Sequence, residues 1–256
     1  MQKSTKDNLP FYILMAITFV LLTIARYYCK QPLLRTLPLY ISLVVGFLQS
    51  RVNRYAPLIG GFNSLLYAYV YYYFGLMAMA AYALFASCPI QLITFLQWNK
   101  RAYKHSTVFR CMTTKQRIWT TVACAAAWLI TYFILKAIGS SYQLLDNTIM
   151  LFGVLISILT MFAFIEYTYL IVVSSIISIY LHAVMLLDKP EQLTYLIFSI
   201  YSLICITRGF FQARALYAEQ QRRNTCQRRR DAVATSRRRY FTPVLPANLF
   251  QRHFHS

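Results

Sequence analysis

Acidic side chains are scarce in this sequence: its 256 residues include seven Asp and Glu, against 26 Lys and Arg. Charged residues of both signs make up 13% of the chain and hydrophobic residues 58%, whereas a soluble domain has about 25% and about 45–50% respectively. None of the seven carboxylates lies clearly in the middle of an apolar run. The composition excludes an ordinary soluble domain and predicts a protein whose main solvent is lipid.

Catalytic and metal-binding motifs are absent as well. The sequence has no His-Glu-x-x-His, no Gly-x-Ser-x-Gly and no pair of carboxylates within an apolar run, so an integral-membrane enzyme is disfavoured. Its six cysteines form no Cys-x-x-Cys pair and show no metal-ligand spacing with the four histidines. We therefore expect no enzymatic activity, no metal, no other cofactor and no disulfide framework.

Long apolar runs dominate what is present. A transmembrane helix needs about 20 mostly apolar residues, and eight runs approach or meet this length, near 10–27, 33–50, 56–74, 75–98, 118–138, 147–165, 167–187 and 192–212. The third and fourth runs meet at Gly75, and the sixth and seventh meet around Glu166. Such short joints predict helical hairpins, because irregular backbone is not tolerated in lipid. The predicted fold is an all-α integral membrane protein with about eight transmembrane helices.

The distribution of Lys and Arg predicts how the helices are oriented. Residues 99–117 contain six basic side chains, which places this loop in the cytoplasm. With eight spans, both termini lie on the same side, and the arginine-rich C-terminal tail agrees. The first connection, with Arg26, Lys30 and Arg35, is basic although it is predicted to lie outside. We expect a multi-pass protein of the cell membrane with both termini in the cytoplasm.

An internal repeat is the next feature of the sequence. Residues 54–59 can be aligned with residues 166–171 at an offset of 112. An offset that spans four helices preserves orientation in the membrane and gives a parallel repeat. The predicted architecture is 1 + (3 + 1 + 3), in which two three-helix bundles are joined by a linker helix. The corresponding segments are an extra helix in 1–32, bundles in 33–98 and 147–212, a basic loop and linker in 99–146, and a basic tail in 213–256.

Residues 61–70, Gly75-Leu76 and 89–98 resemble the PnuC family, the bacterial nicotinamide riboside transporters and their relatives that carry thiamine or riboflavin. Residues 166–180 resemble the matching segment of the second repeat, so that the resemblance covers about 33–212. It implies a parallel-repeat fold related to the SWEET sugar transporters, a homotrimer, and facilitated diffusion. A cytoplasmic kinase would then trap the vitamin by phosphorylation.

The sequence departs from the family in the seventh helix. Family members carry tryptophans and an asparagine there, where this chain has Thr168, Ile171, Ser174 and Ser175. Loss of aromatic and amide groups changes the pocket. The resemblance favours nicotinamide riboside as substrate, and it leaves open thiamine, riboflavin, another nucleoside, or a membrane ligand sensor.

Aromatic and neutral polar side chains populate the helices and supply the candidate substrate site. Asn63 and Tyr67 share one helix face, and Gln91 lies four residues before Phe95. A planar neutral or cationic heterocycle could stack on such rings while an amide fixes its orientation. The candidate substrate-binding residues are Asn63, Tyr67, Gln91, Phe95, Trp98, Tyr167, Ser174 and Ser175.

Each candidate also has a purely structural interpretation. The tyrosines at 69–73 are typical of the aromatic belt at a membrane interface, and Asn63, Gln91 or the serines can simply bond neighbouring helices. His182 is either a ligand contact or a packing residue. Glu166 is either an interfacial turn carboxylate or, less favoured, a coupling group.

The absence of any other carboxylate near the bilayer centre predicts transport without ion coupling. For the tail after residue 212, we expect a flexible segment attracted to anionic lipid. An acidic partner or nucleic acid is the less favoured alternative for this tail.

Overall fold

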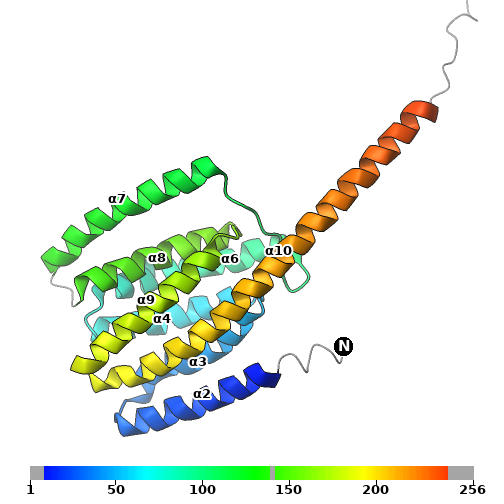
Figure 1. Cartoon of the computed structure of the whole chain (residues 1–256). Coiled ribbons are helices and arrows are strands. Elements are labelled where there is room, and N and C mark those ends of the chain that lie inside the picture. The colour runs from blue at the N-terminus through cyan, green and yellow to red at the C-terminus, as the bar shows by residue number, and fades with distance from the viewer. Residues whose placement is uncertain (1–8, 139–141, 242–256) are drawn as a thin grey trace, which may run out of the picture. The chain divides into compact units, whose positions relative to one another are not determined.

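The computed structural model describes residues 9–138 and 142–241, with side chains up to residue 226 (Figure 1). The chain forms two compact units, Met1–Tyr217 and Ala218–Ser256. Its helices are α2 (Leu9–Tyr28), α3 (Leu33–Ser50), α4 (Ala56–Tyr73), α5 (Met77–Ala81), the π-helical turn η1 (Tyr82–Ser87), α6 (Cys88–Lys100), α7 (Thr114–Ile138), α8 (Gln143–Met161), α9 (Tyr167–Asp188), the 3₁₀ turn η2 (Pro190–Gln192) and α10 (Leu193–Phe241). A short hairpin of β1 (Ala102–Tyr103) and β2 (Ser106–Thr107) follows α6.

The eight predicted helical segments are confirmed, because α5, η1 and α6 together form one segment, Met77–Lys100. Within the described residues, seven helices are long and apolar enough to span a membrane. The segment that falls short is α4, which contains five tyrosines, two glycines, Asn63 and Ser64. Two of its polar side chains, Asn63 and Ser64, are buried and are bonded to Pro38 and Ser87 of neighbouring segments. A span whose polar atoms are bonded inside the protein does not need a high mean hydropathy.

The predicted end of the last helix at residue 212 is wrong. Helix α10 continues to Phe241, so the first part of the tail is helical and not a flexible segment. Residues 213–241 are rich in Ala, Gln and Arg, which favour helix, and Glu219 forms an i,i+4 ion pair with Arg223. The predictions for residues 1–8 and 242–256, and for the arginine side chains at 228–230 and 237–239, lie outside the described part of the chain.

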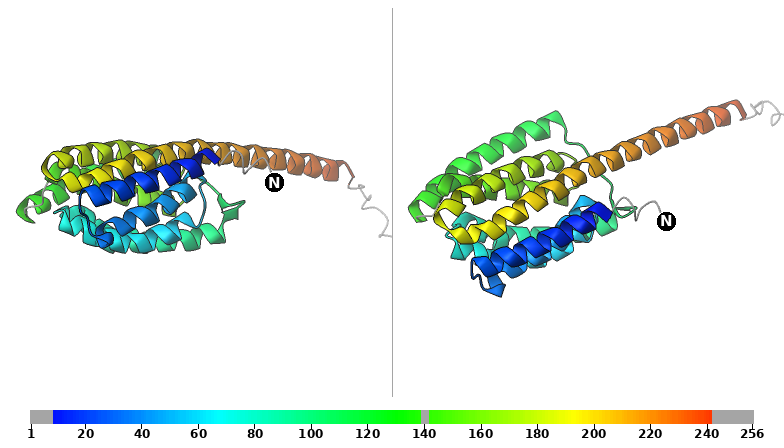
Figure 2. Two further views of the ribbon diagram at one scale, coloured as in Figure 1. Left: turned by 90° about the horizontal axis from the view of Figure 1, so that it is seen from below. Right: turned by 60° about the horizontal axis from the view of Figure 1, so that its bottom comes forward.

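Two groups of helices make up the first unit. Figure 2 shows α3, α4 and α6 on one side and α8, α9 and the start of α10 on the other. In Figure 1 and in the right view of Figure 2, α2 and α7 lie at opposite margins of the unit. A buried cluster joins the two groups, with Leu39, Leu43, Val70 and Phe74 from the first, and Leu181, Met185 and Tyr201 from the second. We call the two groups the first half and the second half.

Two turns with the same conformation support an internal repeat. Val52, after α3, has φ of 53° and Ala163, after α8, has φ of 58°. Each left-handed residue is flanked by the same pair of backbone hydrogen bonds back to its helix, the Schellman pattern that closes a helix C-terminus. The two residues are 111 positions apart, one fewer than the predicted offset of 112. The complete 1 + (3 + 1 + 3) arrangement stays a prediction.

The basic loop after α6 binds both of these turns. The backbone N–H of Arg54 donates to the His105 carbonyl at 3.1 Å. Arg110 donates to the Ala163 carbonyl and accepts from the N–H of Ile165, both at 2.9 Å. The loop therefore connects the first half and the second half at one end of the unit, which we call the basic end. The end that carries the connections 29–32, 74–76 and 189–192 is called the opposite end.

The first connection, whose basic residues disagreed with the predicted orientation, is partly neutralised within the protein. The Arg35 guanidinium forms an ion pair with the Glu191 carboxylate and lies 4.0 Å from the centre of the Tyr73 ring. A compensated charge contributes less to orientation than a free one. Arg35 is therefore a weaker signal for orientation than its charge alone suggests.

Candidate functional site

A π-helical turn in the segment Met77–Lys100 places a tyrosine between the two halves. The Tyr82 hydroxyl donates to the Gly153 carbonyl at 3.0 Å and lies 2.8 Å from the Ser157 hydroxyl. A Cβ at position 153 would lie 2.8 Å from the Tyr82 ring, so this close approach requires glycine. Single π-helical turns within α-helices are frequent at functional sites.

Beside Tyr82 lies a cavity of 270 Å³ between the first and second halves. It reaches from the π-helical turn to the basic end. Its lining residues come from α3, α4, η1, α6, α8, α9 and α10, and comprise Gln49, Val52, Asn53, Ala56, Pro57, Tyr82, Gln91, Thr94, Trp98, Gly153, Ile156, Ser157, Thr160, Tyr167, Thr168, Ile171, Ile206, Gly209 and Phe210. Both halves contribute, so any relative movement of the halves changes the cavity.

The chemistry of this cavity is aromatic and neutral polar. Four rings line it, those of Tyr82, Trp98, Tyr167 and Phe210, together with amide and hydroxyl side chains. None of the described residues that line it is Lys, Arg, Asp or Glu. Such a mixture of apolar walls and a few polar groups is typical of sites for small organic ligands.

Gln91 is the amide that points between the helices at this site. Its Nε2 donates to the hydroxyls of Ser64 at 3.1 Å and of Ser87 at 2.6 Å. Its Oε1 would lie 2.3 Å from a Cβ at position 60, so Gly60 leaves the space that the carbonyl oxygen occupies. The two serines hold the NH₂ group in place, and the orientation of the amide at the cavity wall is thereby fixed.

Trp98 crosses from the first half to the second at the basic end. Its Nε1 donates to the Thr160 carbonyl at 2.8 Å, and its side chain is buried. Its ring packs edge-on against Phe109 of the basic loop, with 6.2 Å between ring centres. Trp98 therefore links the cavity wall to the loop that joins both halves.

A second, smaller cavity of 90 Å³ lies toward the opposite end of the same two halves. It is lined by Tyr67, Tyr71, Ser175, Ser178, His182, Tyr195, Phe198, Ser199 and Ser202. His182 is bonded there, with its Nδ1 3.0 Å from the Gln192 Oε1. The two cavities therefore follow one another along the interface between the halves.

Comparison with known proteins shows the family of the chain. A family model described as nicotinamide mononucleotide transporter matches residues 33–212. The chain belongs to this family. A solved structure described as the vitamin B3 transporter PnuC shares the fold, with a TM-score of 0.70 at 18% sequence identity, over 82% of this chain and 92% of that one. No curated protein sequence matches the chain.

The predicted resemblance to the PnuC family is confirmed, over the range that was predicted. The structure distributes the eight candidate residues over three locations. Gln91, Trp98 and Tyr167 line the larger cavity, Tyr67 and Ser175 line the smaller one, and Asn63, Phe95 and Ser174 line neither. The expected clustering of the candidates in a single site is therefore not what the structure shows.

Asn63 and Tyr67 do share a helix face, as predicted. The Asn63 Nδ2 donates to the Pro38 carbonyl at 2.9 Å and to the Ser42 hydroxyl at 2.8 Å, and the Tyr67 hydroxyl lies 3.0 Å from the same Ser42 oxygen. These bonds join α4 to α3 within the first half. Pro38 lies inside α3, so the Asn63 amide bonds the backbone of that helix as well as a side chain.

Most residues that line the larger cavity were missed by sequence reasoning, and Tyr82 and Ser157 are two of them. Their mutual hydrogen bond depends on the π-helical turn, for which the sequence YALFAS gives no pattern. Thr168 was named only as a departure from the family, and it lines the larger cavity.

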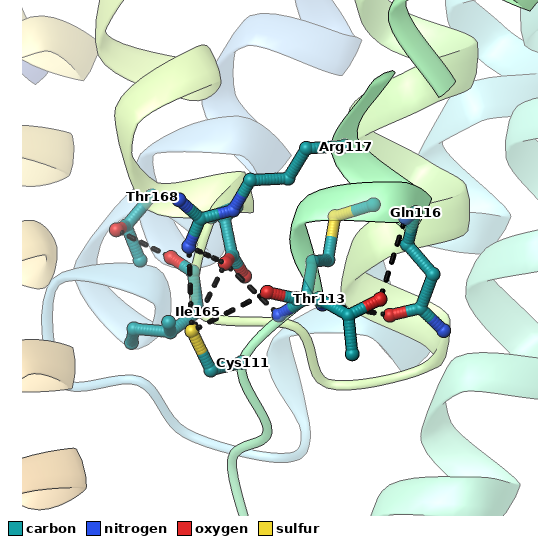
Figure 3. Close-up of polar contacts among 8 residues, drawn as sticks. Cys111, Thr113, Gln116, Arg117, Ile165 and Thr168 are labelled. Carbon is teal, nitrogen blue, oxygen red and sulfur yellow. Dashed lines mark hydrogen bonds and ion pairs between the residues drawn. The ribbon is translucent and has the colours of Figure 1, made fainter. Parts of the chain in front are cut away.

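Glu166 holds the turn between α8 and α9 against the linker that precedes α7 (Figure 3). One carboxylate oxygen accepts from the backbone N–H of Met112 at 3.0 Å, from the Cys111 thiol at 3.3 Å and from the Arg117 guanidinium at 2.7 Å. Its side chain is 16% exposed. The residue is thus a carboxylate that bonds the turn to the linker, and it lies outside both cavities.

This arrangement predicts that the contact between the α8–α9 turn and the linker before α7 weakens in acid. Burial disfavours the charged form, but the hydrogen bonds that the carboxylate accepts outweigh burial and hold the pKa of Glu166 below its usual range. Its contribution to stability is therefore complete above the ordinary glutamate pKa of about 4.3 and is lost as the pH falls through the lower folded-state pKa. We expect Glu166→Gln to lower the unfolding temperature at pH 7 and to flatten its fall below about pH 4.3, measured in detergent. An unchanged acid dependence would contradict this role, and Glu219→Gln is the control.

Proposed function

We propose that this protein carries nicotinamide riboside, or a nucleoside of the same kind, across a cell membrane by facilitated diffusion. The observation that supports this most is the uncharged, aromatic cavity between the two halves. The family model supports a carrier for a nicotinamide compound, and the fold is that of a vitamin B3 transporter.

The cavity chemistry favours the riboside over its phosphorylated mononucleotide. A phosphate group is bound by Arg, Lys or clustered backbone N–H groups. Among the described residues that line the larger cavity there is no basic side chain, so a phosphate entering it would lose water without gaining a cationic partner. Hydroxyl and amide groups such as those of Gln91, Ser157 and Thr168 suit the ribose and carboxamide of an unphosphorylated substrate.

A pyridinium ring gains a further attraction from this site. Aromatic faces attract a cation within about 6 Å of the ring centre, and the cavity presents the rings of Tyr82, Trp98, Tyr167 and Phe210. A positively charged heterocycle could stack there without an acidic partner. A neutral flat ring would bind these aromatic faces more weakly than a pyridinium ring.

The position of the carboxylates supports transport without ion coupling. None of the described acidic residues lines either cavity. Asp146 and Glu166 are both bonded within the protein. Accumulation would then depend on a downstream kinase that phosphorylates the substrate, and the chain itself would be a carrier and not an enzyme. We further propose that the protein forms a homotrimer. We also propose that both termini lie in the cytoplasm, and the basic loop supports this orientation.

The test is uptake by proteoliposomes that contain the purified full chain. Nicotinamide riboside, nicotinamide mononucleotide, thiamine and riboflavin are offered separately, with and without a proton gradient. We expect riboside uptake that is independent of the gradient and much faster than mononucleotide uptake. Uptake of thiamine or riboflavin alone would transfer the proposal to that vitamin, and binding without uptake would identify a sensor.

Closure of the opposite end is part of this proposal. Besides the Arg35–Glu191 ion pair, the Tyr195 hydroxyl donates to the Arg35 carbonyl at 2.7 Å and Lys189 Nζ donates to the Phe74 carbonyl at 3.3 Å. These contacts tie the first half to the second at the end remote from the larger cavity. We infer that they keep this end closed while the larger cavity is accessible from the basic end.

Weakening the ion pair should open the opposite end. Ser202 lines the smaller cavity. In a variant whose native cysteines have been replaced, a cysteine introduced by Ser202→Cys can be labelled by a membrane-impermeant maleimide that is added on the side of the opposite end. We expect Glu191→Gln to accelerate this labelling about threefold to tenfold. Exchange of the two charges, Arg35→Glu with Glu191→Arg, should restore the slow rate, whereas Glu219→Gln should leave it unchanged. Equal rates in all variants would remove Arg35–Glu191 from the closure.

A further inference from the structure

Helix α7 contacts its neighbour α8 through polar bonds in its C-terminal part. The Thr131 hydroxyl donates to the Asn147 Oδ1 at 2.6 Å, and the Asn147 Nδ2 donates to the Trp128 carbonyl at 3.0 Å. The Trp128 indole N–H donates to the Thr148 hydroxyl at 3.1 Å. Asn147 is fully buried, so these bonds fix α7 against α8 at this point.

Toward its N-terminus, α7 leaves a groove of 690 Å³ against α8. Figure 1 shows α7 at the margin of the first unit, beyond α8. The groove walls are almost entirely apolar, with Ala123, Cys124 and Ala127 on α7, and Val154 and Leu155 on α8. Small residues on one wall and larger ones on the other leave a slot along both helices.

The mouth of the groove at the basic end is positively charged. Lys115 lines the groove and is exposed. Arg110 is exposed, and its backbone pairs with Phe164, another lining residue. The nearby Glu166 is already bonded to Arg117. Trp119, which is 73% exposed, lines the same part of the groove, as is typical of a side chain at a membrane interface.

We propose that this groove binds one phospholipid with an anionic headgroup, from the leaflet on the side of the basic loop. One acyl chain lies in the apolar slot between α7 and α8, and the headgroup phosphate binds Lys115 and Arg110. Basic pockets between membrane helices are suited to acidic headgroups. The proposal depends on the membrane fold alone and is independent of the transported substrate.

Charge favours a lipid over a second copy of the chain as occupant. Two copies that met groove to groove would bring their basic mouths together, in a chain with a formal net charge of +19. Like charges at such a contact are destabilising. An anionic lipid supplies the opposite charge, and its chain matches the apolar walls.

The test is native mass spectrometry of the purified full chain, titrated with phosphatidylglycerol or phosphatidylcholine of the same acyl chains. We expect the wild type to prefer phosphatidylglycerol, and Lys115→Gln and Arg110→Gln each to reduce that preference about fivefold. Ala123→Trp fills the slot and should weaken binding of both lipids. Lys100→Gln, an exposed basic residue outside the groove, and Ala125→Trp, on the same helix but outside the lining, are the matched controls.

Several outcomes would overturn the proposal. One is an unchanged preference for phosphatidylglycerol in a variant that carries both Lys115→Gln and Arg110→Gln. Another is undiminished lipid binding in Ala123→Trp. A third is a change of oligomeric state in Ala123→Trp with no change in bound lipid, which would assign the groove to a second copy. If gel filtration shows that the Ala123→Trp variant is misfolded, Ala127→Phe replaces it. The expected loss of binding of both lipids is the same.

Discussion

Replacement of Asp146 by Ala should remove most of the folded protein. Asp146 is completely buried in the first turn of α8, and its two carboxylate oxygens accept from the backbone N–H groups of Ala78 and Met79, both at 3.1 Å. These N–H groups lie in the first turn of α5, where a helix has no internal partner for them. Alanine would leave two buried donors unsatisfied, at a cost of about 3 kcal/mol or more.

The measurement is the unfolding temperature in detergent, together with the yield of monodisperse protein on gel filtration. Asp146→Asn is the matched variant, because its amide oxygen can still accept from one of the two N–H groups, and we expect about half the loss. An Ala variant as stable as the wild type would show that water or another group satisfies α5. Since Asp146 lines neither cavity, any remaining folded Asp146→Asn should transport normally.

Gln91→Ala should reduce substrate uptake at least about tenfold while the protein stays folded. Gln91 lines the larger cavity and its amide is held by Ser64 and Ser87, so a substrate that bonds the amide oxygen loses an oriented partner. The measurement is initial uptake into proteoliposomes at equal protein content. Gln97→Ala is the control, because Gln97 belongs to the same helix and lies outside the lining.

Asn63→Ala should behave differently, although both amides were candidates for the same role. Asn63 lines neither cavity, and its amide bonds Pro38 and Ser42 of α3. We therefore expect a lower unfolding temperature as the first effect, and reduced uptake only as a consequence. Tyr72→Ala, at a position 66% exposed, should change neither. If Gln91→Ala and Asn63→Ala lost stability equally and uptake equally, Gln91 would be a packing residue as well.

The helices could be predicted from the sequence because lipid imposes a simple condition on it. A membrane span must be about 20 residues long and must satisfy its own backbone hydrogen bonds. Each apolar run of this length is therefore expected to form an α-helix. The run 33–50 became Leu33–Ser50 without change, and the run 167–187 became Tyr167–Asp188. The resemblance of residues 61–98 to a transporter family rested on the same kind of local pattern.

The end of α10 could not be predicted by this condition, because outside the membrane a helix is not limited by bilayer thickness. Local helix propensity and the Glu219–Arg223 pair extend it to Phe241. The burial of Asp146 was missed for a related reason. Its sequence position is the edge of an apolar run, and only the arrival of α5 beside α8 removes it from water.

The sequence by itself determined the class of the protein, the number and approximate bounds of its helices, and its family. The length of an apolar run, the distribution of charge and local motifs are properties of residues that are neighbours in the sequence. They do not depend on how the rest of the chain folds. Only the tertiary structure decided which polar side chains face a cavity. Gln91 and Asn63 are alike in chemistry and in placement within apolar runs, but Gln91 lines the cavity between the halves and Asn63 bonds α3. That difference depends on how the helices pack, and packing brings together residues far apart in the chain.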